Sequence, residues 1–104
     1  MIYQIKDDFQ TKILESKIPV LVEFGAQWCG PCKKQLPILE KIQSECGNQL
    51  FVCQIDCDES PQLVKQLGVK SVPALLIFKD GKEISRKIGL ASYSELMEII
   101  KNEH

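Results

Sequence analysis

The sequence contains little histidine and no excess of charge of either sign. Its 104 residues include one histidine, and 13 Lys and Arg residues stand against 14 Asp and Glu residues, for a formal net charge of −1. Without a basic stripe to neutralise phosphates, the chain is not expected to bind nucleic acid. A cysteine hydrolase needs a histidine base. The single histidine is His104, the last residue, which we interpret as part of a frayed terminus.

The sequence also lacks any long apolar run. Residues Met1 to Ile5 lead directly into Lys6, Asp7 and Asp8, which is unlike the apolar segment of a signal peptide. No stretch approaches the roughly 18 apolar residues that a membrane-spanning helix needs. We therefore expect no membrane partner and a cytoplasmic location, where reducing conditions disfavour structural disulfides. The five cysteines agree with this expectation, because an odd number cannot all pair within one chain.

Short apolar segments separated by helical patterns make up the rest of the chain. Hydrophobic residues account for 44% and charged residues for 26%, so we expect one globular domain covering residues 1–104. The segment 19–24 is apolar on both faces except for Glu23, which is typical of a central strand covered by helices on both sides. Strands are predicted at 2–5, 19–24, 50–56, 74–78 and 83–88.

Two helices are predicted in the first half of the chain. Asp7 or Asp8 is expected to cap the first, whose apolar side would consist of Phe9, Ile13 and Leu14. The second begins near residue 30 and ends at Gly47, which is a favourable helix stop. Its apolar residues at helical spacing are Leu36, Leu39, Ile42 and Cys46.

Local signals in the second half predict two more helices and a hairpin. Ser60-Pro61 supplies an N-cap and a first-turn proline for a short helix that ends at Gly68. Asp80-Gly81 predicts a tight hairpin between two antiparallel strands. Ser92 and Glu95 form the pattern of a capping box for the last helix. The order β-α-β-α-β-α-β-β-α predicts an α/β fold with a mixed sheet and helices on both faces.

Two cysteines lie in the turn between the predicted central strand and the helix that follows it, within Trp28-Cys29-Gly30-Pro31-Cys32. Chemistry in α/β sheets gathers at this edge of the strands. Cys29 would lie just before the helix, where unpaired N–H groups and the helix dipole stabilise a thiolate. Cys32 would lie about one turn inside. An exposed, activated Cys29 beside a shielded Cys32 is the arrangement that thiol–disulfide exchange requires.

Other uses of the cysteine pair are less favoured. A structural zinc site usually takes four ligands from two short-spaced pairs, and Cys46, Cys53 and Cys57 supply no second C-x-x-C. A structural disulfide is the simplest alternative, but the pair lies at a functional edge in a protein expected to be cytoplasmic. Redox chemistry is therefore the favoured interpretation.

Glu23 is the one carboxyl group in the predicted central strand, six residues before Cys29. Burial disfavours the charged form, so the pKa of Glu23 is expected to be raised towards neutral, which suits a proton acceptor. The alternative is a glutamate that points to solvent at the edge of the sheet.

The motif and several residues beyond it resemble the thioredoxin family over nearly the whole chain. They are Trp28-Cys29-Gly30-Pro31-Cys32, Pro37, Val72-Pro73, Asp80-Gly81 and Gly89. The resemblance implies an α/β thioredoxin fold, with a central mixed sheet of about five strands flanked by four helices. It also implies a monomeric protein-disulfide reductase and electron carrier in cell redox homeostasis. Such a protein binds no cofactor and receives electrons from NADPH through a thioredoxin reductase.

The resemblance also implies roles for individual residues. Cys29 would attack a substrate disulfide and Cys32 would release the product, while Glu23 matches a buried aspartate that helps to move the proton between the thiols. Pro73 matches a cis proline that faces the cysteine pair, although on the residues alone it could equally begin an edge strand. The substrate-binding surface would consist of Trp28, Gly30, Pro31, Val72, Pro73, Gly89 and Leu90.

Three departures from the family pattern are expected to affect the rate or the reduction potential. Glu23 is one methylene longer than the aspartate of the family. Val52 is assigned to the position of a lysine beneath the active site, which would leave Glu23 without a charged partner. Gly25 replaces an aromatic residue, so the wall beside the motif is expected to be looser. Among the other cysteines, Cys46 and Cys53 are interpreted as core residues and Cys57 as exposed and oxidisable.

Two hypotheses from other classes stay open. The chain could be a binding module, a subunit with this fold whose partner role does not need the thiols. It could also be a metal-binding protein.

Overall fold

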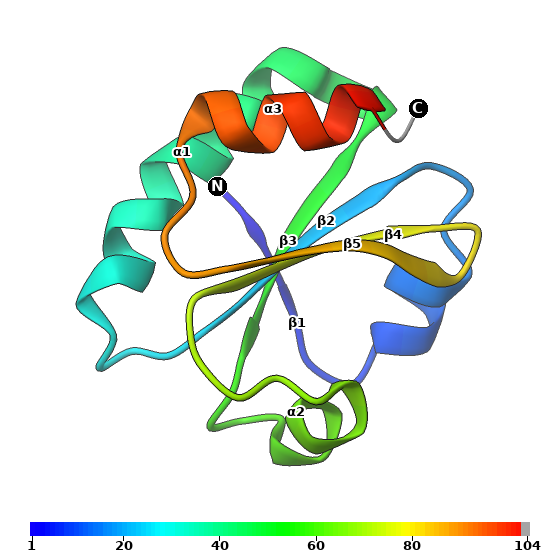
Figure 1. Ribbon diagram of the computed structural model, residues 1–104. Helices are drawn as coiled ribbons and strands as arrows, with labels where there is room; N and C mark the ends of the chain where they lie inside the picture. The colour runs from blue at the N-terminus through cyan, green and yellow to red at the C-terminus, as the bar shows by residue number, and fades with distance from the viewer. Residues whose placement is uncertain (103–104) are drawn as a thin grey trace.

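A five-stranded mixed sheet crosses the middle of the molecule in the computed structural model, which describes residues 1–102 (Figure 1). Strands β1, β3 and β2 run parallel, whereas β4 is antiparallel to β2 and β5 is antiparallel to β4. The order β1-β3-β2-β4-β5 places β2 at the centre, as predicted. The strands are β1 Tyr3–Ile5, β2 Val20–Gly25, β3 Phe51–Asp56, β4 Ala74–Lys79 and β5 Lys82–Ile88. The expectation for His104 lies outside the described residues.

Helices cover both faces of the sheet, which confirms the predicted layers. They are the π-helical turn η1 Gln10–Leu14, α1 Gly30–Cys46, the 3-10 turn η2 Gly47–Gln49, α2 Pro61–Leu67 and α3 Tyr93–Asn102. Figure 1 shows α1 and α3 together on one side of the sheet and α2 on the other. Of the helices within residues 1–102, none combines the length and apolar character that crossing a membrane requires.

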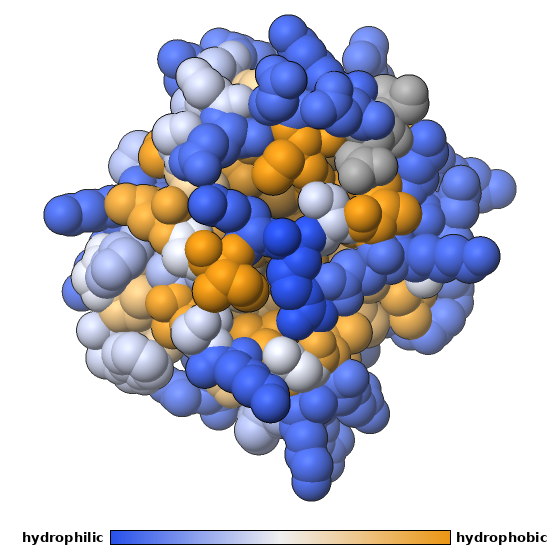
Figure 2. Space-filling view, viewed as in Figure 1, coloured by the Kyte–Doolittle hydropathy of each residue, from blue (hydrophilic) through white to orange (hydrophobic). Residues whose placement is uncertain are grey.

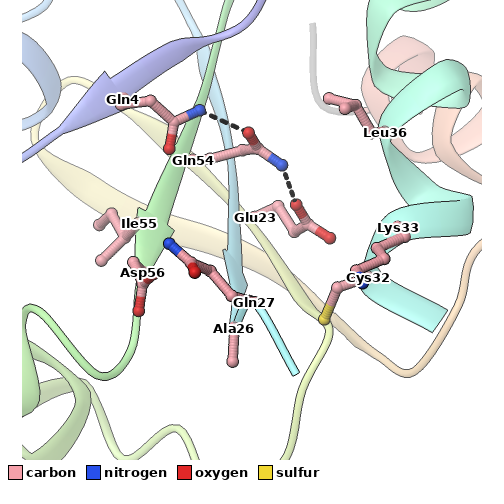
Figure 3. A pocket seen from close by; sticks show the side chains of 11 residues that line it. Gln4, Glu23, Ala26, Gln27, Cys32, Lys33, Leu36, Gln54, Ile55 and Asp56 are labelled. Carbon is pink, nitrogen blue, oxygen red and sulfur yellow. Dashed lines mark hydrogen bonds between the residues drawn. The ribbon is translucent and has the colours of Figure 1, made fainter. Parts of the chain in front are cut away.

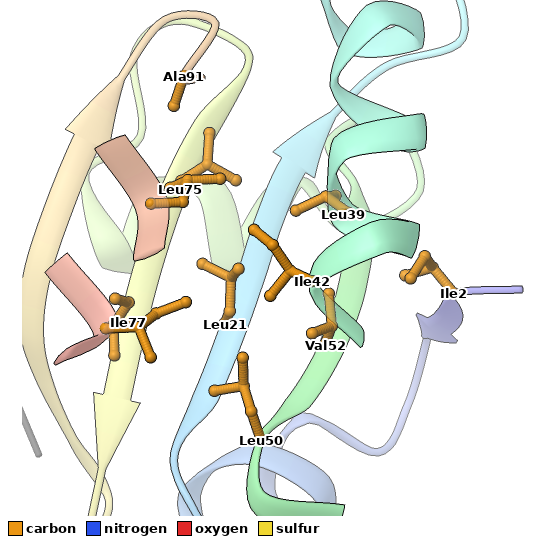
Figure 4. Close-up of a cluster of buried hydrophobic side chains, with 11 residues drawn as sticks. Ile2, Leu21, Leu39, Ile42, Leu50, Val52, Leu75, Ile77 and Ala91 are labelled. Carbon is orange, nitrogen blue, oxygen red and sulfur yellow. The ribbon is translucent and has the colours of Figure 1, made fainter. Parts of the chain in front are cut away.

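Each face of the sheet has its own hydrophobic core, and β2 contributes to both. Leu21 packs with Leu39 and Ile42 of α1 in the first core, part of which is drawn in Figure 4. Val22 and Phe24 belong to the second core on the opposite face. Because successive side chains of a strand point to opposite faces, a strand covered on both sides must be apolar throughout. This explains why Glu23 stands out in β2.

The predicted hairpin and capping box of the second half are confirmed, whereas Ser60 at the N-cap of α2 makes no side-chain cap hydrogen bond. Asp80 and Gly81 both have positive φ, 53° and 79°, and they connect β4 to β5 as a tight hairpin. At the start of α3, the Ser92 N–H donates to Glu95 Oε1 at 2.9 Å, and the Glu95 N–H donates to Ser92 Oγ at 3.0 Å. The capping box therefore satisfies two of the N–H groups at this end of the helix.

The predicted cap of the first helix is wrong. The structure has one π-helical turn, η1, whose N-cap is Phe9 and which has no side-chain cap. The Asp8 carboxylate instead accepts hydrogen bonds from the Tyr3 hydroxyl and from the Lys6 N–H. These bonds hold the carboxylate at the end of β1, away from the N–H groups of the turn.

Candidate active site

The two cysteines of the motif are joined by a disulfide at the start of α1, with their Cα atoms 5.3 Å apart. Cys29 is the N-cap residue of α1, and its Sγ accepts a hydrogen bond from the Cys32 N–H at 3.2 Å. Pro31 lies in the first turn, where its missing N–H costs the helix nothing. The Cys32 N–H and the positive end of the helix dipole therefore both face the sulfur of Cys29, which favours a thiolate there.

The expectation that Cys29 is exposed is wrong for this disulfide form. Cys29 has 4% of its surface exposed and Cys32 has 6%, so both residues are buried. The covalent bond to Cys32 and the hydrogen bond from its N–H hold the Cys29 sulfur against the first turn of α1. Neighbouring Trp28 is the exposed member of the motif, with 71% of its surface accessible.

Glu23 is buried in the centre of the sheet, with 1% of its surface exposed. Burial raises the pKa of its carboxyl group, and a hydrogen bond from the Gln54 side chain partly opposes that shift. The Gln54 amide donates to Glu23 Oε1 at 2.6 Å. The alternative position at a solvent-facing edge does not apply, because β2 has a neighbouring strand on each side.

Val52, the residue expected to leave Glu23 without a charged partner, is not the residue of β3 that pairs with Glu23. In the register of β2 and β3, Glu23 pairs with Gln54, whereas Val52 pairs with Leu21. Val52 points to the same face of the sheet but two residues earlier along the strand, inside the apolar core. The partner of Glu23 is consequently a neutral amide.

A cavity of about 190 Å³ is lined by both the Glu23 carboxyl group and Cys32 (Figure 3). Gly25 leaves the wall between these two residues without a side chain. A Cβ atom at Gly25 would lie 3.3 Å from Cys32 Sγ, tighter than ordinary packing. The missing side chain therefore lets the Cys32 sulfur lie close to the backbone of β2. Other lining residues are Gln4, Ala26, Gln27, Lys33, Leu36, Gln54, Ile55 and Asp56.

Hydrogen bonds connect the segments that carry the predicted substrate-binding residues. Pro73 is buried and follows a cis peptide bond from Val72, and its C=O accepts from the Gly89 N–H at 2.8 Å. The next residue, Leu90, is 44% exposed. Ile88, which the sequence did not indicate, is also exposed, at 48%. Figure 2 shows that hydrophilic side chains divide the apolar surface of the face it presents into separate areas.

The structure adds a buried polar residue that sequence reasoning missed. Gln35 of α1 is fully buried, and its side chain donates to the Ala91 C=O and accepts from the Ala91 N–H, both at 2.9 Å. This pair of bonds ties the loop after β5 to the helix that begins at the cysteine pair. The available signal was helical spacing, since Gln35 lies four and seven residues before the core residues Leu39 and Ile42.

The remaining cysteines lie away from the disulfide. Cys53 is fully buried, and Cys46 is partly buried against the first core. The expectation of an exposed Cys57 is wrong: the residue is half-buried, and burial together with Asp56 and Asp58 raises the pKa of its thiol to about 11. Within residues 1–102, no three His, Cys, Asp or Glu side chains gather in a way that could hold a metal ion.

Burial of Glu23 predicts a dependence of stability on pH. Its pKa is raised from the ordinary value of 4.5 when the chain is folded. Over the range between the unfolded and the folded pKa the folded state binds more protons, so the free energy of unfolding falls as pH rises through this range. Urea unfolding should be measured for the wild type and for Glu23→Gln at several pH values across this range. The free energy of unfolding should fall with rising pH in the wild type alone. Parallel curves for the two proteins would contradict the expectation.

Comparison with known proteins gives consistent matches. The thioredoxin family model matches residues 1–102. The chain is 38% identical to the thioredoxin of Rickettsia typhi over 101 residues, which is 96% of each chain. It is 40% identical to the thioredoxin of Acidithiobacillus ferridurans over 103 residues, covering 99% of this chain and 95% of that one. It is 41% identical to the thioredoxin of Mycobacterium bovis over 98 residues, covering 90% and 84%.

Proposed function

The chain belongs to the thioredoxin family, and on this premise we propose which role each site residue has in the reduction of disulfides. The protein is a thiol–disulfide oxidoreductase that reduces protein disulfides by cycling the Cys29–Cys32 pair between dithiol and disulfide. The observation that carries this function is the disulfide between these two residues at the start of α1.

In the proposed mechanism, the Cys29 thiolate attacks one sulfur of a substrate disulfide. That S–S bond breaks, a mixed disulfide forms, and the second substrate sulfur leaves as a thiolate that takes up a proton. Cys32 then loses its proton and attacks Cys29 Sγ. This second exchange forms the Cys29–Cys32 bond and releases the other substrate sulfur as a thiolate. Two electrons have passed from the cysteine pair to the substrate.

Glu23 is proposed to accept the proton from Cys32. Its burial supports this role, because the raised pKa of Glu23 brings the carboxyl group closer to the working pH of a general base. The two residues line one cavity of about 190 Å³. Water occupies roughly 30 Å³ per molecule in the liquid, so this space is large enough for a water that carries the proton between them.

Substrate proteins are proposed to dock on the surface around Cys29. Exposed Trp28 would supply an apolar platform, held in place by the bond from its indole N–H to an Asp58 carboxylate oxygen at 2.9 Å. The Val72 backbone would pair with an extended substrate segment, and Leu90 would add apolar surface. The remaining contributors are Gly30, Pro31, Pro73 and Gly89. We also propose a monomeric single domain over residues 1–104 that works in the cytoplasm and receives electrons from NADPH through a thioredoxin reductase.

Equilibration of the Cys29–Cys32 pair against glutathione and against a known thioredoxin tests this proposal. A reductase is expected to have a potential within about 30 mV of the known thioredoxin value of about −270 mV. It should also turn over with NADPH, a thioredoxin reductase and a disulfide-containing protein. A potential near the roughly −120 mV of a strong oxidant would contradict the reductase role. If a Cys29→Ser, Cys32→Ser double variant still supported a partner's activity, the binding-module hypothesis would replace it.

A further inference from the structure

Three polar side chains form a row across three adjacent strands, from the edge of the sheet to its centre. Gln4 of β1 pairs with Gln54 of β3, and Gln54 pairs with Glu23 of β2. The side chains are joined as well: the Gln4 amide donates to Gln54 Oε1 at 2.5 Å, and the Gln54 amide donates to Glu23 Oε1 at 2.6 Å (Figure 3). All three line the cavity that also contains Cys32.

The row has a fixed direction. The Gln4 amide nitrogen also donates to the backbone C=O of Ile2 at 3.2 Å, and a carbonyl oxygen can only accept. Gln4 must therefore present its NH₂ group to Gln54, which turns the oxygen of Gln54 towards Gln4 and its NH₂ group towards Glu23. The reverse orientation would place the Gln54 oxygen against the carboxylate, where two acceptors repel each other.

The two oxygens of Glu23 consequently differ. Oε1 is held by Gln54, whereas Oε2 is buried and has no hydrogen-bond partner among the described residues. Figure 3 shows the oxygen that is not bonded to Gln54 on the side of the carboxyl group towards Cys32. A buried acceptor without a partner is costly in a folded protein, which makes Oε2 the oxygen available to a proton.

We propose that Gln54, oriented by Gln4, is the positioning residue that holds Glu23 Oε1 and thereby directs Oε2 to receive the proton of Cys32. The proposal rests on the proposed role of Glu23 as proton acceptor. Because an amide holds the carboxyl group without adding a positive charge, Glu23 keeps a higher proton affinity than it would beside a cation.

Other ionisable groups lie near the Glu23 carboxyl group. Lys33 of α1 and Asp56 of β3 line the same cavity as Glu23, and the Cys57 thiol interacts electrostatically with the carboxylate. On the β4 side, the cross-strand partner is the apolar Leu75. These groups are unchanged in variants of Gln54 and Gln4, so a shift in the pH profile of such a variant reports on the row itself.

The test is a pH profile of the release step, in which Cys32 resolves the mixed disulfide, measured by single-turnover kinetics. In Gln54→Leu, Glu23 loses the one hydrogen-bond donor that the described residues give its carboxylate, so the midpoint of the pH profile should move to higher pH. The release rate at pH 7 should fall about tenfold, the scale of one hydrogen bond to a charged group. The attack of Cys29 on the substrate should keep its rate, which a general structural defect would not allow.

Gln4→Leu provides a second variant at the exposed edge of the sheet. Its profile should move in the same direction with a smaller fall in rate, about twofold to threefold, because Gln54 remains but is no longer oriented. Gln54→Lys should move the midpoint to lower pH by placing a cation beside the carboxylate. Gln66→Leu, an exposed position on α2, is the control and should match the wild type.

The Glu23→Gln variant distinguishes a failure of the role proposed for Glu23 from a failure of the role proposed for Gln54. If this variant releases product with the wild-type rate and pH profile, the role proposed for Glu23 fails. If it abolishes the pH dependence while Gln54→Leu and Gln4→Leu leave the profile in place, the role of Glu23 stands and the positioning role of Gln54 is wrong. NMR titration of the Glu23 carboxyl in Gln54→Leu should show the same upward displacement as the kinetics, and an unchanged titration would overturn the proposal.

Discussion

A Cys32→Ser variant is expected to capture substrate proteins and fail to release them. Cys29 remains at the N-cap of α1, beside the backbone N–H of residue 32, and can still attack a substrate disulfide. A serine hydroxyl does not displace a thiolate from the mixed disulfide, so the second exchange is lost. Steady-state reduction should fall by at least about a thousandfold, as when a residue that forms or breaks covalent bonds is removed. Non-reducing gel electrophoresis with mass spectrometry would identify the trapped adduct at Cys29.

Two further variants make this result specific. Cys29→Ser should neither capture substrate nor turn over, because it removes the attacking sulfur. Cys46→Ser, which alters a partly buried cysteine outside the motif, should keep wild-type turnover and form no stable adduct. Capture by Cys29→Ser, or its absence from Cys32→Ser, would show that attack and release have been assigned to the wrong sulfurs.

The sequence predicted the central features of the fold because each depends on local chemistry. A strand that is apolar on both faces must be covered on both sides, which located β2 at the centre of the sheet. Positive φ at Asp80 and Gly81 is a backbone requirement that this pair of residues meets readily, so the hairpin followed from two residues. The burial of Glu23 followed from the same reasoning about β2.

Features that depend on pairing between distant segments could not be predicted in this way. Gln54 and Val52 point to the same face of β3, and only the register with β2 decides which of them meets Glu23. The bond between Gln35 and Ala91 joins residues 56 positions apart, and nothing in α1 alone identifies its partner. The low exposure of Cys29 is a property of the disulfide form. The spacing of the two cysteines does not indicate how deeply either sulfur is buried in that form.

Hydrogen bonds connect three segments, namely the segment before β4, the end of β5 and helix α1, and Gln35 joins two of them. The Pro73 C=O accepts from the Gly89 N–H, so the segment before β4 holds the end of β5. Two residues later, Ala91 is bonded through both of its backbone groups to Gln35 of α1. Cys32 lies one helical turn before Gln35. The loop that carries the exposed Leu90 is therefore fixed relative to the helix that carries the disulfide.

Gln35→Leu is consequently expected to destabilise the fold strongly, although it replaces a buried polar residue with an apolar one of similar size. The leucine cannot bond to Ala91, whose N–H and C=O would stay buried without partners. Each unsatisfied group costs about 1–3 kcal/mol, so for these two groups the free energy of unfolding should fall by about 2–6 kcal/mol. Urea unfolding should show a lower midpoint with an unchanged slope.

The exposed Gln66→Leu is the matched control, and surface substitutions of this kind usually change stability by less than about 0.5 kcal/mol. A second readout follows from the position of the Ala91 bonds, which join α1 to the loop that carries Leu90. Loosening this loop should raise KM for a protein substrate more than for a small disulfide, because in the proposed docking mode only a protein reaches Leu90. Wild-type stability in Gln35→Leu would mean that the backbone of Ala91 finds other partners, and that the packing around the loop, rather than Gln35, holds it against α1.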